Sequence, residues 1–282
     1  MPQLAVAAVQ TAPTADPGEN LAALTVAVSE AARAGARLVV LPEEAMLLAE
    51  AVDRAGGADA LARVVDLAWP AFLAHLSDLA AQHEVWIIAG GYEPSGSDRP
   101  FNTLVVLDAH GGVVAEYRKL HLYDAFAYRE SDYVTPGDDV PPVVLVDGVA
   151  IGLVNCYDLR FPELARDLVD RGADVLSVSA AWVAGPRKED HWETLVRARA
   201  IENTCWVIAA GSASPDCVGT SMLVDPLGVV RTALPPTGTG TVAGVVSLDR
   251  TAEIREHLPA LANRRLTTTV SVAPELVPEP EV

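Results

Sequence analysis

The sequence has 282 residues, half of them hydrophobic, and a formal net charge of −18 at pH 7. Such a length suffices to fill the core of one large α/β domain. The acidic charge disfavours nucleic acid and anionic membrane surfaces as partners, because both would repel it.

The cysteines indicate a reducing environment. Cys156, Cys205 and Cys217 lack the spacing of metal ligands, so we expect neither a disulfide framework nor a metal site, and a cytoplasmic location. The first ten residues resemble a strand more than a signal peptide, and no apolar segment is expected to span a bilayer.

The chain begins with alternating strands and helices. A strand over 4–9 precedes a helix over 20–34, which Gly35 ends, and a strand over 37–41 leads directly to Glu43. A carboxylate after a buried strand lies at the sheet edge where α/β proteins assemble their sites. A solvated turn is the alternative for an isolated glutamate.

A second helical region is predicted over 58–83, with an interruption at Pro70. Three strands follow, over 85–89, 103–107 and 113–119. The last two form a hairpin that brings Lys119 to a loop. The irregular segment 125–142 is long for a simple connection, which suggests that it lines a site.

Cys156 follows a short apolar strand over 149–154 and precedes a helix over 162–171. A cysteine at such a junction can lie beside free backbone N–H groups, which stabilise a thiolate and an oxyanion. A lone cysteine is also typical of a small buried apolar residue.

The segments 31–41 and 168–178 share one pattern, a helix end, Gly-Ala, a polar residue and a buried strand. This repeat predicts two similar α/β halves that face each other. The remaining predicted elements are a helix over 192–204, strands over 206–210, 221–224, 229–231 and 241–247, and a last helix from Leu248. We assign residues 1–270 to one domain and residues 271–282 to an extended acidic C-terminal arm.

Four segments of the sequence match the motifs of one known family. They are 39–43, 118–124 with 130–137 after it, 155–163 and 197–203. In these segments, and along nearly its whole length, the sequence resembles the nitrilase superfamily of carbon–nitrogen hydrolases. The resemblance implies a four-layer α-β-β-α sandwich of two mixed sheets, which agrees with the internal repeat.

The resemblance also implies catalytic roles without any cofactor. Cys156 would attack an amide carbonyl and form a thioester, and Glu43 would act as general base. Lys119 and the backbone N–H of Tyr157 would stabilise the oxyanion. Glu130 would position the substrate and the lysine.

The turn after Cys156 resembles the amidase branches, including omega-amidases and the amidases of deaminated glutathione. This implies a small, carboxylate-bearing amide substrate that yields an acid and ammonia. Arg160 corresponds to a position that holds the substrate carboxylate in carbamoyl-amino-acid hydrolases, a task that suits its forked guanidinium. Alternatively, Arg160 pairs with Asp158 or Glu163 and stiffens the turn.

Further substrate-binding candidates are Tyr157, Trp182, Tyr128 and Phe126. Trp182 follows a predicted strand and either covers the pocket or packs in the core. Phe126 and Tyr128 lie in a loop that departs from the omega-amidase pattern, so they could line a different pocket.

Three other functions stay open at this point. They are nitrile hydrolysis within the same superfamily, a non-catalytic scaffold on the same fold, and a papain-like pairing of Cys156 with His121 or His191. By resemblance we expect a homodimer or a larger homo-oligomer, with the helix after Cys156 and the C-terminal arm at the contact.

Overall fold

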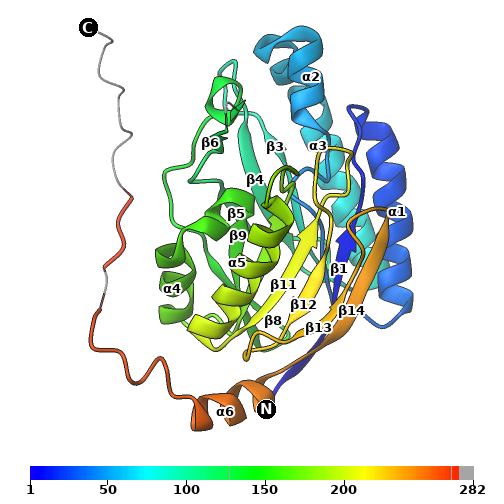
Figure 1. Cartoon of the computed structure of the whole chain (residues 1–282). Coiled ribbons are helices and arrows are strands. Elements are labelled where there is room, and N and C mark those ends of the chain that lie inside the picture. The colour runs from blue at the N-terminus through cyan, green and yellow to red at the C-terminus, as the bar shows by residue number, and fades with distance from the viewer. Residues whose placement is uncertain (127, 268, 273–282) are drawn as a thin grey trace, which may run out of the picture.

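The structure is a computed structural model that describes residues 1–126, 128–267 and 269–272. Two six-stranded sheets lie face to face (Figure 1). The strands of the first sheet are, in spatial order, β14 (Gly240–Ser247), β1 (Gln3–Gln10), β2 (Leu38–Val40), β3 (Trp86–Glu93), β4 (Phe101–Leu107) and β5 (Val113–Arg118). Those of the second are β13 (Val230–Ala233), β12 (Met222–Val224), β11 (Trp206–Gly211), β10 (Val175–Ala180), β9 (Val149–Asn155) and β8 (Val143–Val146).

The two sheets have the same topology. In the first, β1, β2 and β3 are parallel, and β4 and β5 follow antiparallel. In the second, β9, β10 and β11 are parallel, and β12 and β13 follow antiparallel. An antiparallel strand, β14 or β8, pairs with the first strand of each set. This arrangement confirms the repeat predicted from the sequence. In both halves a glycine with positive φ, Gly35 or Gly172, lies just beyond the first helix.

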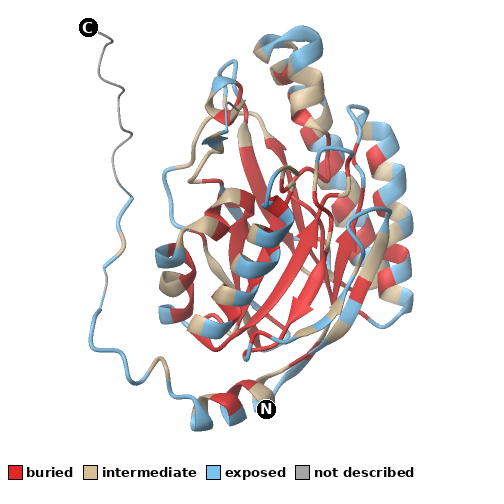
Figure 2. Cartoon of the chain, in the orientation of Figure 1, coloured by how far each residue is buried: buried red, intermediate tan, exposed pale blue. Residues whose placement is uncertain are grey.

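Helices cover the outer faces of both sheets and complete the four predicted layers. Three separate apolar cores result, one between the sheets and one under the helices on each side. The helices are α1 (Pro17–Arg33), α2 (Ala49–Gly56), α3 (Ala58–His83), α4 (Pro162–Asp170), α5 (Lys188–Asn203) and α6 (Leu248–His257). The central strands are buried almost throughout, whereas the edge strands, such as β14, and the outer faces of the helices are partly exposed (Figure 2).

Strand β1 shows how the sequence builds two of these cores at once. Leu4, Val6 and Ala8 belong to the core between the sheets, whereas Ala7 and Val9 pack under the helices. Successive side chains of a strand point to opposite faces. A strand with apolar residues on both faces therefore contributes to two cores at once, which explains the unbroken apolar run from Leu4 to Val9.

Helix α3 differs from two predictions made from the sequence, an interruption at Pro70 and the absence of any segment long enough to span a bilayer. It continues through Pro70, because this residue lies on the solvent side, where the carbonyl left without a donor is open to water. By length and composition alone, α3 could cross a membrane, contrary to the prediction that no segment is long enough. Its residues Trp69, Phe72 and Leu76 pack in the core beneath the first sheet, which is the behaviour of a core helix.

Several short elements were not predicted, strand β8 among them. Helix α2 occupies the connection after Glu43, and a small hairpin of β6 (Asp124–Ala125) and β7 (Tyr128–Arg129) lies within the long loop. The 3₁₀ helices η1 (Glu130–Asp132) and η2 (Cys156–Arg160) follow β7 and β9. Of the predicted C-terminal arm, residues 273–282 lie outside the described residues, so the arm stays a prediction.

Candidate active site

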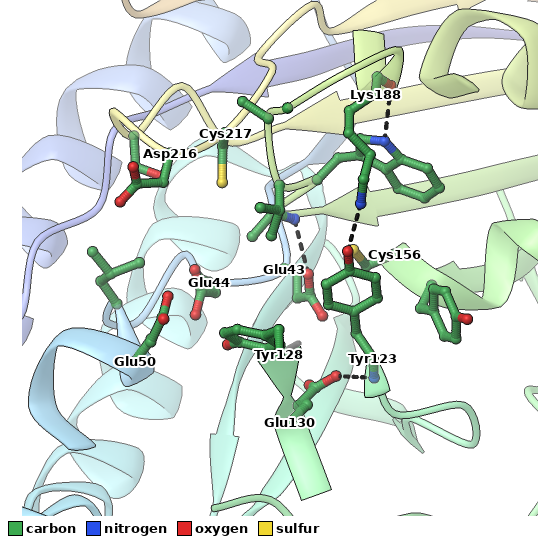
Figure 3. Close-up of a pocket in the computed structure, with 18 of the residues that line it drawn as sticks. Glu43, Glu44, Glu50, Tyr123, Tyr128, Glu130, Cys156, Lys188, Asp216 and Cys217 are labelled. Carbon is green, nitrogen blue, oxygen red and sulfur yellow. Dashed lines mark hydrogen bonds between the residues drawn. The ribbon is translucent and has the colours of Figure 1, made fainter. Parts of the chain in front are cut away.

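The ends of four strands meet around one cavity. Glu43 follows β2, Lys119 follows β5, Cys156 follows β9 and Ala181 follows β10. The cavity has a volume of about 920 Å³ (Figure 3). All nine predicted site residues line it, namely Glu43, Lys119, Glu130, Cys156, Tyr157, Arg160, Trp182, Tyr128 and Phe126.

A buried lysine lies between two buried carboxylates. The Nζ atom of Lys119 lies 2.7 Å from Oε1 of Glu43 and 2.8 Å from Oε2 of Glu130. Backbone donors bind both carboxylates as well. The N–H of Ala181 donates to Oε2 of Glu43 at 2.8 Å, and that of Tyr123 donates to Oε2 of Glu130 at 2.7 Å. These bonds fix both carboxylates, since a buried charge is tolerated only when it is paired and hydrogen-bonded.

The charges of this cluster follow from their partners. Burial alone would raise the pKa of Glu43, but the Lys119 ammonium and its hydrogen bond hold the pKa below the usual value. Burial would lower the pKa of Lys119, but Glu130 and Glu43 together raise it well above normal. Glu43 is therefore ionised and Lys119 protonated at neutral pH.

Cys156 occupies a strained turn. Its φ angle of 47° lies in the left-handed region, which a residue with a side chain adopts at a cost. Burial raises the pKa of its thiol well above normal, and the Glu43 carboxylate raises it further, against the effect of Lys119. The resting sulfur is thus a thiol beside an ionised base.

Two buried asparagines connect the halves of the site, and sequence reasoning missed both. Asn102, on β4, donates to Glu43 at 2.8 Å and to Glu130 at 3.0 Å. Asn155 precedes the nucleophile and donates to the side-chain oxygen of Asn102 at 2.9 Å. The only sequence signal was an amide in each of two mostly apolar strands, where an unpaired polar group would be costly.

The histidine alternatives lie away from the sulfur. Nδ1 of His121 lies 2.7 Å from Asp158, and its ring stacks on Phe161 at 3.6 Å. Neither His121 nor His191 is among the residues that line the cavity. The geometry therefore gives no support to a papain-like pair.

Arg160 does not pair with Asp158 or Glu163 among the described ion pairs. Its guanidinium instead lies 4.7 Å from the ring centroid of Trp182 and 5.8 Å from that of Tyr157. The alternative in which an ion pair stiffens the turn is therefore not seen.

The aromatic candidates form the wall and the rim of the cavity. Trp182 lines the cavity and is also buried, with its ring centroid 5.5 Å from that of Trp192. The hydroxyl of Tyr128 hydrogen-bonds to that of Tyr133. Phe126 is 73% exposed, which places it at the rim.

Several ionisable cavity residues were missed, among them Glu44 and Lys188. Glu44 adjoins Glu43 in the sequence and accepts a hydrogen bond from the hydroxyl of Tyr92 at 2.9 Å. Lys188 begins α5 and lies beside Tyr123 on the opposite side of the cavity (Figure 3). Its position directly after Glu43 could have predicted Glu44 from the sequence. Nothing in the sequence distinguishes Lys188 from an ordinary surface lysine.

Comparison with known proteins identifies the family. A family model described as carbon–nitrogen hydrolase matches residues 5–256. A deaminated glutathione amidase from Escherichia coli O157:H7 is 40% identical over 260 residues, which cover 92% of this chain and 97% of the relative.

Solved structures agree. The NitFhit protein of Caenorhabditis elegans is 31% identical with a TM-score of 0.83, over 93% of this chain and 65% of that one. An amidase from Nesterenkonia sp. AN1 is 26% identical with a TM-score of 0.76, over 93% of this chain and 94% of that one. That structure, a glutamate-to-glutamine variant, has the acetamide moiety of fluoroacetamide attached covalently to its active-site cysteine. The chain therefore belongs to the carbon–nitrogen hydrolase family, within the nitrilase superfamily.

Proposed function

We propose that this carbon–nitrogen hydrolase converts a small, carboxylate-bearing amide into the acid and ammonia through a thioester on Cys156. The observation that carries the proposal is the convergence of Glu43, Lys119 and Cys156, from three strand ends, on one cavity. A nucleophile, a base and a cation are the three groups that acyl transfer to sulfur requires.

In the first half of the reaction, Glu43 takes the proton of the Cys156 thiol as the sulfur attacks the amide carbonyl. The oxyanion that forms lies between the Lys119 ammonium and the backbone N–H of Tyr157, a preorganised pair of donors. Glu43 then passes its proton to the amide nitrogen, and the C–N bond breaks to release ammonia.

In the second half, Glu43 removes a proton from a water molecule that attacks the thioester. The same donors stabilise the second oxyanion. The C–S bond then breaks, and Glu43 returns its proton to the sulfur, which gives the carboxylic acid and the thiol. Glu130 and Asn102 keep Lys119 and Glu43 in place throughout, as their hydrogen bonds suggest.

The relatives favour amide substrates over nitriles. The E. coli relative is named a deaminated glutathione amidase, and the Nesterenkonia protein is named an amidase. The presence of all three reactive groups in one cavity also favours catalysis over a scaffold role.

The test is ammonia release from glutaramate, a five-carbon acid with a terminal amide. We expect Cys156→Ala to lower the rate at least about a thousandfold, because no thioester can form. Glu43→Gln should lower the rate comparably without a mass increase on Cys156, because Glu43 also activates the thiol and protonates the leaving nitrogen. Cys217→Ala is the matched control, and wild-type activity in Cys156→Ala would refute the proposal.

We further propose a homodimer or larger homo-oligomer in the cytoplasm. The resemblance to the nitrilase superfamily supports the assembly, and the unpaired cysteines support the compartment. Sedimentation of the full chain tests the assembly, and a single species of 29.7 kDa would contradict it.

A further inference from the structure

Lys188 is a buried cation in the cavity with no role in the reaction described above. Its side chain is only slightly exposed, and Nζ contacts the hydroxyl of Tyr123. The ammonium lies 4.7 Å from the ring centroid of Tyr123 and 4.1 Å from that of Phe126. The indole N–H of Trp182 donates to the Lys188 carbonyl at 3.0 Å and thereby fixes the backbone at this point.

Arg160 is a second cation on the same side of the cavity. Trp182 connects the two, since its ring faces the Arg160 guanidinium while its N–H holds Lys188. The buried Nη2 atom of Arg160 has no hydrogen-bond partner among the described residues. Burial and then the charge of Arg160 lower the pKa of Lys188, so the two cations interact.

This arrangement is costly without an anion. No carboxylate of the described residues forms an ion pair with Lys188 or Arg160. Lys188 is also the first residue of α5, where the helix dipole disfavours a positive charge. Contacts with aromatic rings offset only part of the cost of burying an unpaired cation. A bound anion would therefore complete the site.

The opposite wall of the cavity fixes where that anion lies. On the side away from Lys188, burial raises the pKa of Glu44 to about 8, so it is mostly neutral, and Glu50 pairs with Arg54. Asp216, on the same side, forms no ion pair among the described residues (Figure 3). A substrate carboxylate is attracted to Lys188 and Arg160, and Asp216 on the far side repels it. The charges thus orient an amide that carries a carboxylate.

We propose that Lys188 and Arg160 hold the carboxylate of the acyl group between them, and that their combined charge rejects an ammonium group beside that carboxylate. This inference rests on the proposed amide hydrolysis. Lys188 then acts as a specificity residue that separates deaminated amides from amides of amino acids, through attraction to one and repulsion of the other.

Three substrates with the same five-carbon chain test the inference. Glutaramate has the carboxylate, glutaramide replaces it with a neutral amide, and L-glutamine adds an ammonium group beside it. In Lys188→Gln we expect the kcat/KM ratio of glutaramate to glutaramide to fall about tenfold, mainly through KM, because a charged hydrogen bond is lost. The ratio of glutaramate to L-glutamine should fall as well.

Arg187→Gln is the matched control, since it removes the same charge from the neighbouring, exposed residue. Both ratios should stay within about twofold of wild type there, as for a surface charge. Unchanged ratios in Lys188→Gln would overturn the inference. So would an equal loss on all three substrates, because Lys188 would then only support the fold.

A binding measurement separates this inference from the proposed reaction. Glutarate, the acid product, is titrated calorimetrically into Cys156→Ala with and without Lys188→Gln. We expect Kd to rise about tenfold when Lys188 is replaced. An unchanged Kd would overturn the inference even if the wild type hydrolyses the amide. If the wild type hydrolyses no amide but Lys188→Gln weakens glutarate binding, the result would count against the proposed function alone.

Discussion

Glu44 and Glu43 show how strongly a neighbouring charge can separate the pKa values of two adjacent carboxyls. Glu43 pairs with Lys119, whereas Glu44 receives only hydrogen bonds, from the hydroxyl of Tyr92 and the N–H of Ala49. Burial and the charge of Glu43 raise the pKa of Glu44 to about 8. One carboxyl is thus an ionised base and the next a neutral acid, although the residue type is the same.

This difference predicts the pH dependence of stability. A carboxyl whose pKa rises on folding binds its proton more tightly in the folded state. The folded protein therefore loses stability between about pH 4 and pH 8, by up to about 1.4 kcal/mol per pH unit. Glu44→Gln keeps the hydrogen-bond acceptor but cannot ionise. Relative to wild type, we expect its free energy of unfolding to rise by about 2 to 4 kcal/mol between pH 5 and pH 8.

Urea titrations at several pH values measure this difference. Glu116→Gln, at an exposed position of β5, is the control and should show no such trend. A stability difference for Glu44→Gln that is constant with pH would contradict the raised pKa.

At the scale of the elements, the close approach of β3 to the base depends on a glycine. A Cβ atom on Gly90 would lie 2.0 Å from the carbonyl oxygen of Glu43 and 2.4 Å from its Cα. The N–H of Gly90 also donates to Pro42 at 3.2 Å. Only glycine permits this approach between β3 and the turn that carries Glu43.

Gly90→Ala should therefore displace the catalytic carboxylate. We expect a loss of about 1 to 3 kcal/mol in the free energy of unfolding and a fall of about tenfold or more in kcat/KM, because small shifts of a reacting group are costly. Gly240→Ala on β14 is the control, since its nearest neighbours are flexible Leu234 side-chain atoms at 3.3 Å. Equal activity of the two variants would contradict the argument.

The elements also show what the sequence could and could not predict. Apolar periodicity located nearly all the long strands and helices, because burial on one or two faces dictates their patterns. Helix α2 and the continuity of α3 through Pro70 were missed, since both depend on which face meets solvent. The reactive residues could be found because each follows a predicted strand and lies in a segment that resembles the nitrilase superfamily. Asn102 and Lys188 could not, because their partners come from distant segments.

At the scale of the whole molecule, the active site joins the two halves of the sandwich. Asn102 belongs to the first sheet and Asn155 to the second, and their side chains bond at 2.9 Å. Ser179 on β10 similarly donates to the carbonyl of Leu41, next to β2, at 2.7 Å. The packing of the sheets therefore sets the distance between the base of one half and the nucleophile of the other.

Asn102→Ala should consequently lower stability and activity together. Removal of the amide leaves Asn155 and one oxygen of each carboxylate short of a partner, at a cost of about 1 to 3 kcal/mol in the free energy of unfolding. We expect kcat to fall at least about tenfold, because Glu43 and Cys156 lose their common support.

Thr103→Val is the matched control on the same strand. It removes a hydrogen bond of 3.0 Å to Glu93 outside the cavity, so it should lower stability without lowering kcat. Denaturant titration and steady-state kinetics on both variants make the comparison, and an equal effect on kcat would show that the sheets hold the site without this bond.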